Sequence, residues 1–227
     1  MKKIVLLFGL SVITTLIFAQ EAEKKQKKER NPNEIQTLFD NDGYTSHGGY
    51  GAINMFYTQL GTGENARSAF VSGIKGAWII DHTFEIGIDA NSFISESRPE
   101  PALGNSSYMY TGAFGGILLA VNIFPEKPIN LSIPVTLGAG GVSYMGNYLN
   151  YDEYYDYYPE SVYAYFMVMP GLELQLNMTK FMRLAIHASY RYTSNIYMEY
   201  NINPNVIGDQ NLMRGLNLGA SLKFGKF

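Results

Sequence analysis

The chain has 227 residues, a formal net charge of -3 and no cysteine. This length suits one domain of ordinary size, and the weak negative charge provides no basic field for nucleic acid, for which we find no binding motif. The absence of cysteine excludes disulfides, thiolate metal sites, a catalytic thiol and a lipoprotein anchor. Plentiful tyrosine, phenylalanine and glycine, with 16% charged residues, favour a half-buried sheet protein with many tight turns.

The first segment has the features of an export signal. Residues 1–3 form a positive n-region, and the apolar stretch over residues 4–18 is too short to span a membrane comfortably. Ala19 supplies the small residue of a cleavage site, so we expect residues 1–19 to be a signal peptide; the alternative is an uncleaved N-terminal helix. The mature chain is then exported, and its sequence predicts no transmembrane helix.

A charged, low-complexity stretch follows the apolar segment, with the sequence QEAEKKQKKERNPN over residues 20–33. It cannot bury enough apolar area to fold alone, so we expect residues 20–45 to form a charged periplasmic linker. A tether to the cell wall or to lipid phosphates is the functional alternative that the charge pattern leaves open.

From about Ser46 onward the hydrophobic period is two, which indicates β-strands. The connections between the strands alternate between short and long, and the strands approach the roughly ten residues that a tilted strand needs to cross a bilayer. We therefore predict an all-β fold over residues 46–227, an antiparallel, up-and-down, eight-stranded transmembrane β-barrel with apolar residues toward lipid. The predicted strands cover residues 48–60, 67–79, 84–91, 108–123, 129–140, 161–176, 182–191 and 216–224.

Two features resist this scheme. Pro134 and Pro170 lie inside predicted strands, where proline removes a ladder hydrogen bond, so we expect a bulge or local distortion at each. The terminal Phe227 is out of phase with Phe224, so either Phe224 faces the membrane and a short tail follows, or the strand bulges at Gly225. The alternative fold is a soluble lipocalin-like barrel with its apolar face inward.

A cluster of charged residues falls on the predicted lumen face. Unpaired charges would be costly there, so we expect ion pairs. Lys75 should pair with Glu85 if the turn between them is residues 79–81, and Glu173 should pair with Arg183 if their turn is residues 177–179. The cluster predicts a salt-bridge network that plugs the lumen, and its members are Lys75, Glu85, Asp89, Glu173, Arg183, His187, Arg191 and Lys223.

Aromatic residues supply two further candidate features. On the outward face they should mark the membrane interfaces, with Trp78, Phe84 and Phe224 at the periplasmic end and Tyr57, Phe166 and Tyr192 at the outer end. A tyrosine-rich outer loop suits recognition of a partner, although its spacing matches no EF-hand, and a solvated loop near lipopolysaccharide is the alternative. Its candidate residues are Tyr151, Asp152, Glu153, Tyr154, Tyr155, Asp156, Tyr157 and Tyr158.

The stretches HGGYGAINMFYTQL, GAWIIDHTFEIGIDA, INLSIPVTLGAGGVSY and PGLELQLNMTKFMRLAIHASYRYTS resemble the small outer-membrane barrels described as OmpA/OmpX-like. The resemblance covers most of residues 46–227, and its hairpin patterns are specific for architecture and weak for activity. It implies a place in the outer membrane of a Gram-negative envelope, among its lipids and lipopolysaccharide. It also implies that the barrel-assembly machinery recognises the last strand, LNLGASLKFGKF.

We expect a structural or surface-interaction role, with no cofactor, no metal site and no nucleic-acid partner. The first alternative is a narrow, porin-like conduit or a small-ligand barrel that uses the charged lumen. The second is a lipid A-modifying enzyme, because His187 and Ser189 resemble the dyad of the lipid A deacylase family. Both residues share the predicted lumen face with Arg183, where a bilayer substrate cannot reach them, so we expect no enzyme.

Overall fold

The computed structural model describes residues 46–63, 66–101, 106–146, 161–199 and 209–227. The expected signal peptide, the expected linker and the tyrosine-rich residues 151–158 lie outside the described residues. Within the described ranges, no helix is long and apolar enough to cross a membrane.

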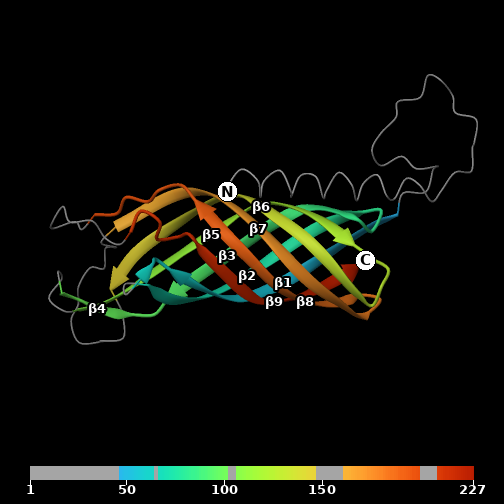
Figure 1. Cartoon of the computed structure of the whole chain (residues 1–227), viewed down its shortest axis with the longest axis horizontal. Coiled ribbons are helices and arrows are strands. Elements are labelled where there is room, and N and C mark those ends of the chain that lie inside the picture. Colours follow the sequence, from blue (N-terminus) through green and yellow to red (C-terminus); the bar gives the residue numbers. More distant parts are fainter. Residues whose placement is uncertain (1–45, 64–65, 102–105, 147–160, 200–208) are drawn as a thin grey trace, which may run out of the picture. The chain divides into compact units, whose positions relative to one another are not determined.

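The strands pair antiparallel in chain order, and the first and last strands pair with each other (Figure 1). This closure leaves no unpaired sheet edge. The short β4 extends the wall that β3 forms beside β5, so the barrel has eight strands, as predicted. The strands are β1 His47–Leu60, β2 Arg67–Ile80, β3 Phe84–Ser95, β4 Arg98–Glu100, β5 Ser106–Ile123, β6 Ile129–Gly146, β7 Ser161–Thr179, β8 Met182–Thr193 and β9 Gly215–Lys226.

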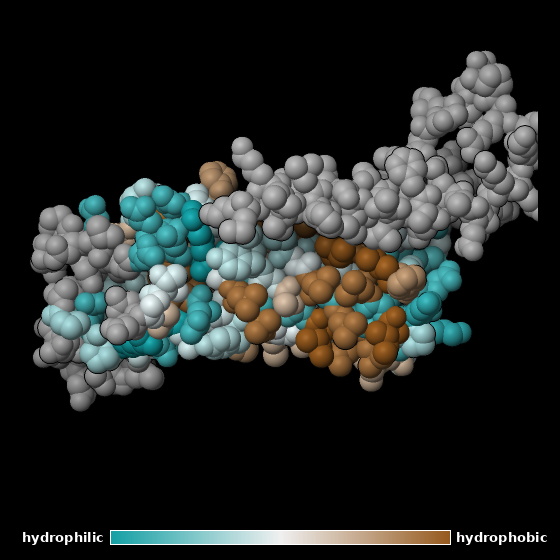
Figure 2. Space-filling view, in the orientation of Figure 1, coloured by the Kyte–Doolittle hydropathy of each residue, from teal (hydrophilic) through white to brown (hydrophobic). Residues whose placement is uncertain are grey.

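The barrel wall has an exposed apolar face and a buried face that carries most of the charge. Along β1, Ile53 and Met55 are about half exposed, whereas Asn54 between them is buried. Large apolar side chains are exposed in this way on all eight wall strands. On the face that Figure 2 shows, hydrophobic residues gather over part of the barrel, with hydrophilic residues at both ends. Such a band loses its contact with water only in lipid, so the lipocalin-like alternative, which needs the apolar face inward, is wrong.

Three short turns lie at one end of the barrel. The first is residues 81–83, and Asp81 and His82 there have φ values of 51° and 54°, a left-handed conformation that these side chains tolerate better than most. The second is residues 124–128. The third is only Lys180 and Phe181, because β7 has a register shift between Asn177 and Thr179. The first two turns have three and five residues, and such odd lengths keep the apolar faces of the joined strands on the same side of the wall; the bulge supplies the extra residue at the third.

The two prolines interrupt the sheet without shifting its register. Between β6 and β7, pairing stops after Ser132 and resumes at Val135, with the same register on both sides. Between β7 and β8, pairing stops in the same way between Val168 and Gly171. Pro134 and Pro170 lack an N–H group to donate, so the expected distortion is present as a gap in the ladder. At both prolines the distortion is this gap and not a bulge.

The last strand keeps its register to the end, since Lys226 pairs with Gly49 and no bulge occurs at Gly225. Phe224 faces outward and is 42% exposed. The ring of Phe227 lies 5.9 Å from that of Tyr50, which is buried inside the barrel. Phe227 therefore belongs to the inner face of the strand, which explains its apparent phase error.

Candidate functional site

The candidate site is the charged interior of the barrel. Its members come from alternate positions on β2, β3, β7, β8 and β9, because successive side chains of a strand point to opposite faces of the wall. All of them are buried except His187, which is partly exposed. The members are the eight residues of the predicted lumen cluster: Lys75, Glu85, Asp89, Glu173, Arg183, His187, Arg191 and Lys223.

Glu173 on β7 is the centre of this lumen cluster. Its carboxylate forms ion pairs with Lys75 from β2 and with Lys223 from β9, the second at 2.6 Å. Gln175 Nε2 also donates to Glu173 Oε2 at 3.2 Å, and Arg183 Nη1 donates to Gln175 Oε1 at 3.2 Å. Two buried cations thus share one carboxylate in an interior of low dielectric constant, where the attraction is strong.

The two expected ion pairs do not form. The turn after β2 lies two residues later than expected, so Lys75 lies opposite Asp89 and not opposite Glu85. Arg183 does not contact Glu173 directly, because the side chain of the glutamine described above lies between them. The partner of Glu173 across the lumen is instead Lys75, which is 98 residues away in the sequence.

Uncharged side chains donate hydrogen bonds to the other two lumen carboxylates, those of Glu85 and Asp89. Tyr50 Oη donates to Glu85 at 2.7 Å, and Asn122 Nδ2 donates to the same carboxylate at 2.8 Å. Asp89 accepts hydrogen bonds of 3.0 to 3.4 Å from Asn54, Asn91 and Thr136. These neutral partners were not predicted, although they lie on the inward faces of β1, β3, β5 and β6, where the period of two was the signal that could have identified them.

His187 and Ser189 line the interior on the lumen face of β8. His187 Nδ1 lies 3.3 Å from Ser221 Oγ, and Ser189 Oγ accepts a hydrogen bond from Asn217 Nδ2 at 3.1 Å. Both residues border a cavity of about 30 Å³ beside Glu173, which has room for about one water molecule. No hydrogen bond joins His187 to Ser189, both of which are described, so the pair lacks the geometry of a His–Ser dyad.

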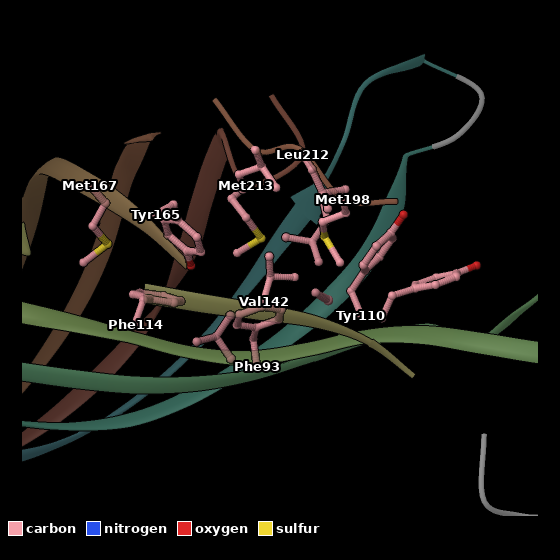
Figure 3. Close-up of a cluster of buried hydrophobic side chains, with 14 of the residues drawn as sticks. Phe93, Tyr110, Phe114, Val142, Tyr165, Met167, Met198, Leu212 and Met213 are labelled. Carbon is pink, nitrogen blue, oxygen red and sulfur yellow. The ribbon is translucent and has the colours of Figure 1, made fainter. Parts of the chain in front are cut away.

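Toward the long loops, an apolar cluster occupies the lumen (Figure 3). Some members extend inward from the barrel wall, and others come from the segments on either side of the connection between β8 and β9. Our sequence analysis did not identify this inner cluster, because it assigned the apolar residues of the strands to lipid. Its members are Phe56, Leu60, Ala69, Val71, Phe93, Tyr110, Phe114, Val142, Tyr144, Tyr165, Met167, Met169, Ile196, Met198, Leu212 and Met213.

At the same end, Arg67 links several strands of the rim. Its guanidinium carbon lies 4.9 Å from the ring centre of Tyr110 and 5.5 Å from that of Tyr144. Arg67 Nη1 also donates to the Tyr108 carbonyl oxygen at 2.7 Å. Tyr144 Oη in turn donates to Glu100 at 2.6 Å. These contacts join β2, β4, β5 and β6 near the long loops.

The six aromatics expected at the membrane interfaces belong to the outer face of the wall. Five of them are clearly exposed, and Phe84 is partly exposed. Trp78, Phe84 and Phe224 lie close to the short turns, and Tyr57, Phe166 and Tyr192 lie farther along the strands.

No protein-family model matches the sequence, and a search of curated proteins gives no significant match. Among solved structures, Neisserial surface protein A (NspA) shares 14% identity over 81% of this chain and 99% of its own, with a TM-score of 0.50. Ail of Yersinia pestis shares 10% identity over 79% of this chain and 96% of its own, with a TM-score of 0.41. The outer membrane protease OmpT of Escherichia coli shares 8% identity over 85% of this chain and 99% of its own, with a TM-score of 0.32.

Identities of this size concern the fold alone. The likeness to NspA shows that the chain has the fold of a small outer-membrane β-barrel, and the resemblance inferred from the sequence is confirmed at that level.

Proposed function

We propose that the chain is an outer-membrane barrel with a structural or surface-interaction role, and that its own side chains plug the lumen. The observation that carries this proposal is that side chains occupy the interior at three successive levels. Phe227 and Arg183 lie near the short turns, the Glu173 ion pairs follow, and the apolar cluster extends toward the long loops. An eight-stranded barrel is just wide enough for side chains to fill it.

The lipid-facing band and the fold shared with NspA support a place in the outer membrane. β1 begins at the short-turn end, where His47 pairs with Ile80, and β9 ends there as well. Short turns face the periplasm in barrels of this type, so both ends of the barrel domain are periplasmic. This arrangement agrees with an exported chain whose signal peptide, residues 1–19, precedes a periplasmic linker, residues 20–45.

The barrel wall is longer than a membrane requires. β5 and β6 have 18 residues each and β7 has 19, whereas a tilted strand crosses the bilayer with about 9–11 residues. About seven residues of each strand, or about 16 Å at a tilt of about 45°, therefore stand in water beyond the hydrocarbon. We call this outer part of the wall the raised end, and we propose as the recognition segment residues 151–158, which lie in the sequence between the ends of β6 and β7.

The outer wall and the last strand define the remaining partners in this proposal. The exposed apolar band contacts outer-membrane lipids, and the raised end lies among lipopolysaccharide head groups. The last strand, Gly215–Lys226, carries the outward Phe224 and is the segment that the barrel-assembly machinery would recognise.

Planar-bilayer recording tests the plug. If the plug is complete, the purified barrel should insert without discrete conductance steps. Steady single-channel currents through the wild-type protein would overturn the plug and support the conduit alternative. Mass spectrometry of lipid A, with and without the protein, tests the enzyme alternative, and loss of an acyl chain would show that the barrel modifies lipid.

Labelling of single introduced cysteines tests the outer-membrane location and the orientation of the barrel in the membrane, since the chain has no cysteine of its own. Ser107→Cys at the raised end should react with a membrane-impermeant maleimide on intact cells. His82→Cys in a periplasmic turn should react only after the outer membrane is permeabilised. Labelling of His82→Cys on intact cells, with Ser107→Cys protected, would overturn the orientation.

A further inference from the structure

We propose that the outer half of the lumen binds a small monovalent anion of about the size of chloride, between the guanidinium of Arg191 and the hydroxyl of Tyr165. Arg191 on β8 is 0% exposed, and Tyr165 on β7 is 2% exposed. The site lies beside the apolar cluster, apart from the ion pairs of Glu173, and the proposed surface role does not depend on it.

Arg191 is the member of the lumen cluster whose positive charge has no carboxylate partner among the described residues. The other buried cations of this cluster have carboxylates nearby: Lys75 and Lys223 pair with Glu173, and Arg183 lies in the field of Glu85. Tyr165 is an ionisable neighbour of Arg191, but a tyrosine hydroxyl is uncharged near neutral pH and supplies no counter-charge. A guanidinium stays charged in proteins, and a buried charge is costly without a counter-charge. An anion from solution would supply the negative counter-charge that the described residues do not provide.

The guanidinium of Arg191 also has unused hydrogen-bond donors. Its Nε donates to the Met213 carbonyl oxygen at 2.7 Å, whereas Nη1 and Nη2 have no hydrogen-bond partner in the described structure. The guanidinium carbon lies 4.7 Å from the ring centre of Phe114. This cation–π contact does not engage the N–H groups, which point outward in the guanidinium plane. An acceptor in that plane would complete the coordination.

The hydroxyl of Tyr165 is a second unused donor in the same region. It is buried and has no hydrogen-bond partner in the described structure. A Cβ on Gly140 would lie 2.6 Å from Tyr165 Oη and 2.7 Å from Phe114 Cβ, so the hydroxyl lies beside Phe114. Figure 3 shows the Tyr165 hydroxyl turned toward Phe114. Both sets of free donors thus lie near the side chain of Phe114, the guanidinium over its ring and the hydroxyl near its Cβ.

The surroundings favour one class of ligand. The neighbouring Phe114, Met169 and Met213 are apolar and buried, so an anion that holds its hydration shell strongly would lose too much solvation there. One guanidinium balances one negative charge. A monovalent, weakly hydrated halide therefore fits better than phosphate or sulfate, and a water molecule would leave the charge of Arg191 uncompensated.

Bromide is the probe, because its anomalous X-ray scattering identifies it. The whole barrel is refolded into detergent in sodium bromide and crystallised, and the expected result is an anomalous peak within hydrogen-bonding reach of Arg191 Nη and Tyr165 Oη. In solution, the midpoint of thermal unfolding should rise with bromide when gluconate keeps the ionic strength constant. Arg191→Met should abolish both effects, whereas Arg183→Met, at the other arginine of the lumen cluster, should keep the bromide dependence.

A second variant keeps the proposal testable if Arg191→Met fails to fold. Tyr165→Phe removes one donor and should raise the half-saturating bromide concentration about tenfold, as the loss of one hydrogen bond to a charged group predicts. No bromide peak in the wild-type crystal would overturn the proposal. A bromide dependence that Tyr165→Phe or Arg191→Met leaves unchanged would also overturn it, and would assign the effect to adventitious surface binding.

Discussion

The carboxylate of Glu173 on β7 lies 2.6 Å from the ammonium group of Lys223 on β9, with both side chains buried. The same carboxylate forms an ion pair with Lys75 from β2. One anion therefore holds two cations from strands that are distant in the sequence. A buried charge without its partner carries a large desolvation cost. The cluster therefore favours the strand register that brings these partners together over other registers.

Removal of the shared carboxylate should be severe. Glu173→Gln leaves two buried ammonium groups without their anion, and we expect a loss of about 3–5 kcal/mol in the free energy of unfolding. Denaturant unfolding of the barrel in lipid vesicles measures this loss. Glu126→Gln, in an exposed turn, is the control, with an expected change below about 0.5 kcal/mol. Equal stability of the two variants would show that the Glu173 cluster does not stabilise the fold.

A close approach in the wall predicts a second sensitive position. Gly138 on β6 pairs with Gly116 on β5, and a Cβ on Gly138 would collide with the Gly115 carbonyl oxygen. Gly138→Ala should therefore cost about 1–3 kcal/mol, because the backbone must shift. Gly51→Ala is the matched control, since a Cβ there would meet nothing within 4 Å. If both variants unfold at the same denaturant concentration, the two strands are farther apart than described.

The inward turn of Phe227 predicts a coupling with Arg183. The guanidinium carbon of Arg183 lies 4.0 Å from the ring centre of Phe227. Phe227→Ala should lower the free energy of unfolding by about 1–3 kcal/mol, because it removes this cation–π contact and the ring contact with Tyr50. In a double-mutant cycle with Arg183→Met, the two losses should be less than additive by about 0.5–2 kcal/mol. Strict additivity would mean that the ring and the guanidinium do not interact.

Much of the fold was predictable, because a period of two separates the apolar face of a strand from its polar face. The alternation from Ile129 to Gly140 indicated a strand with an apolar face. The outward residues on either side of two short turns have equal parity, which requires an odd number of turn residues, and these turns have three and five. Neither pattern depends on where a strand lies in the barrel. Both can therefore be recognised in the sequence without knowing which residues contact each other across the lumen.

The partners inside the lumen could not be predicted in the same way. They depend on register, and register depends on details such as the left-handed Asp81 and the bulge between Asn177 and Thr179. A turn displaced by two residues changed the neighbour of Lys75. The contact between Lys75 and Glu173 crosses the lumen, and no local pattern encodes it.

Substitution of Arg67, at the long-loop end of the barrel, should change local stability there without changing the global stability of the barrel. Arg67 holds the Tyr108 carbonyl oxygen and lies against the rings of Tyr110 and Tyr144. Arg67→Met should loosen the outer ends of β2, β5 and β6, and backbone amides there, including that of Tyr110, should exchange with solvent at least about tenfold faster. The measurement is amide hydrogen exchange on the barrel in lipid, with Lys180→Met, in an exposed turn at the other end, as the control.

The global unfolding midpoint of Arg67→Met should stay close to that of the wild type. The lipid-embedded part of the wall holds the apolar band and the ion pairs of Glu173, and neither contacts Arg67 in the described structure. A rim that opens on its own is a local unfolding unit above the membrane, whereas a rim that melts with the barrel is part of one cooperative unit. Unchanged exchange at Tyr110, or a large drop in the global midpoint, would contradict a separately stabilised rim.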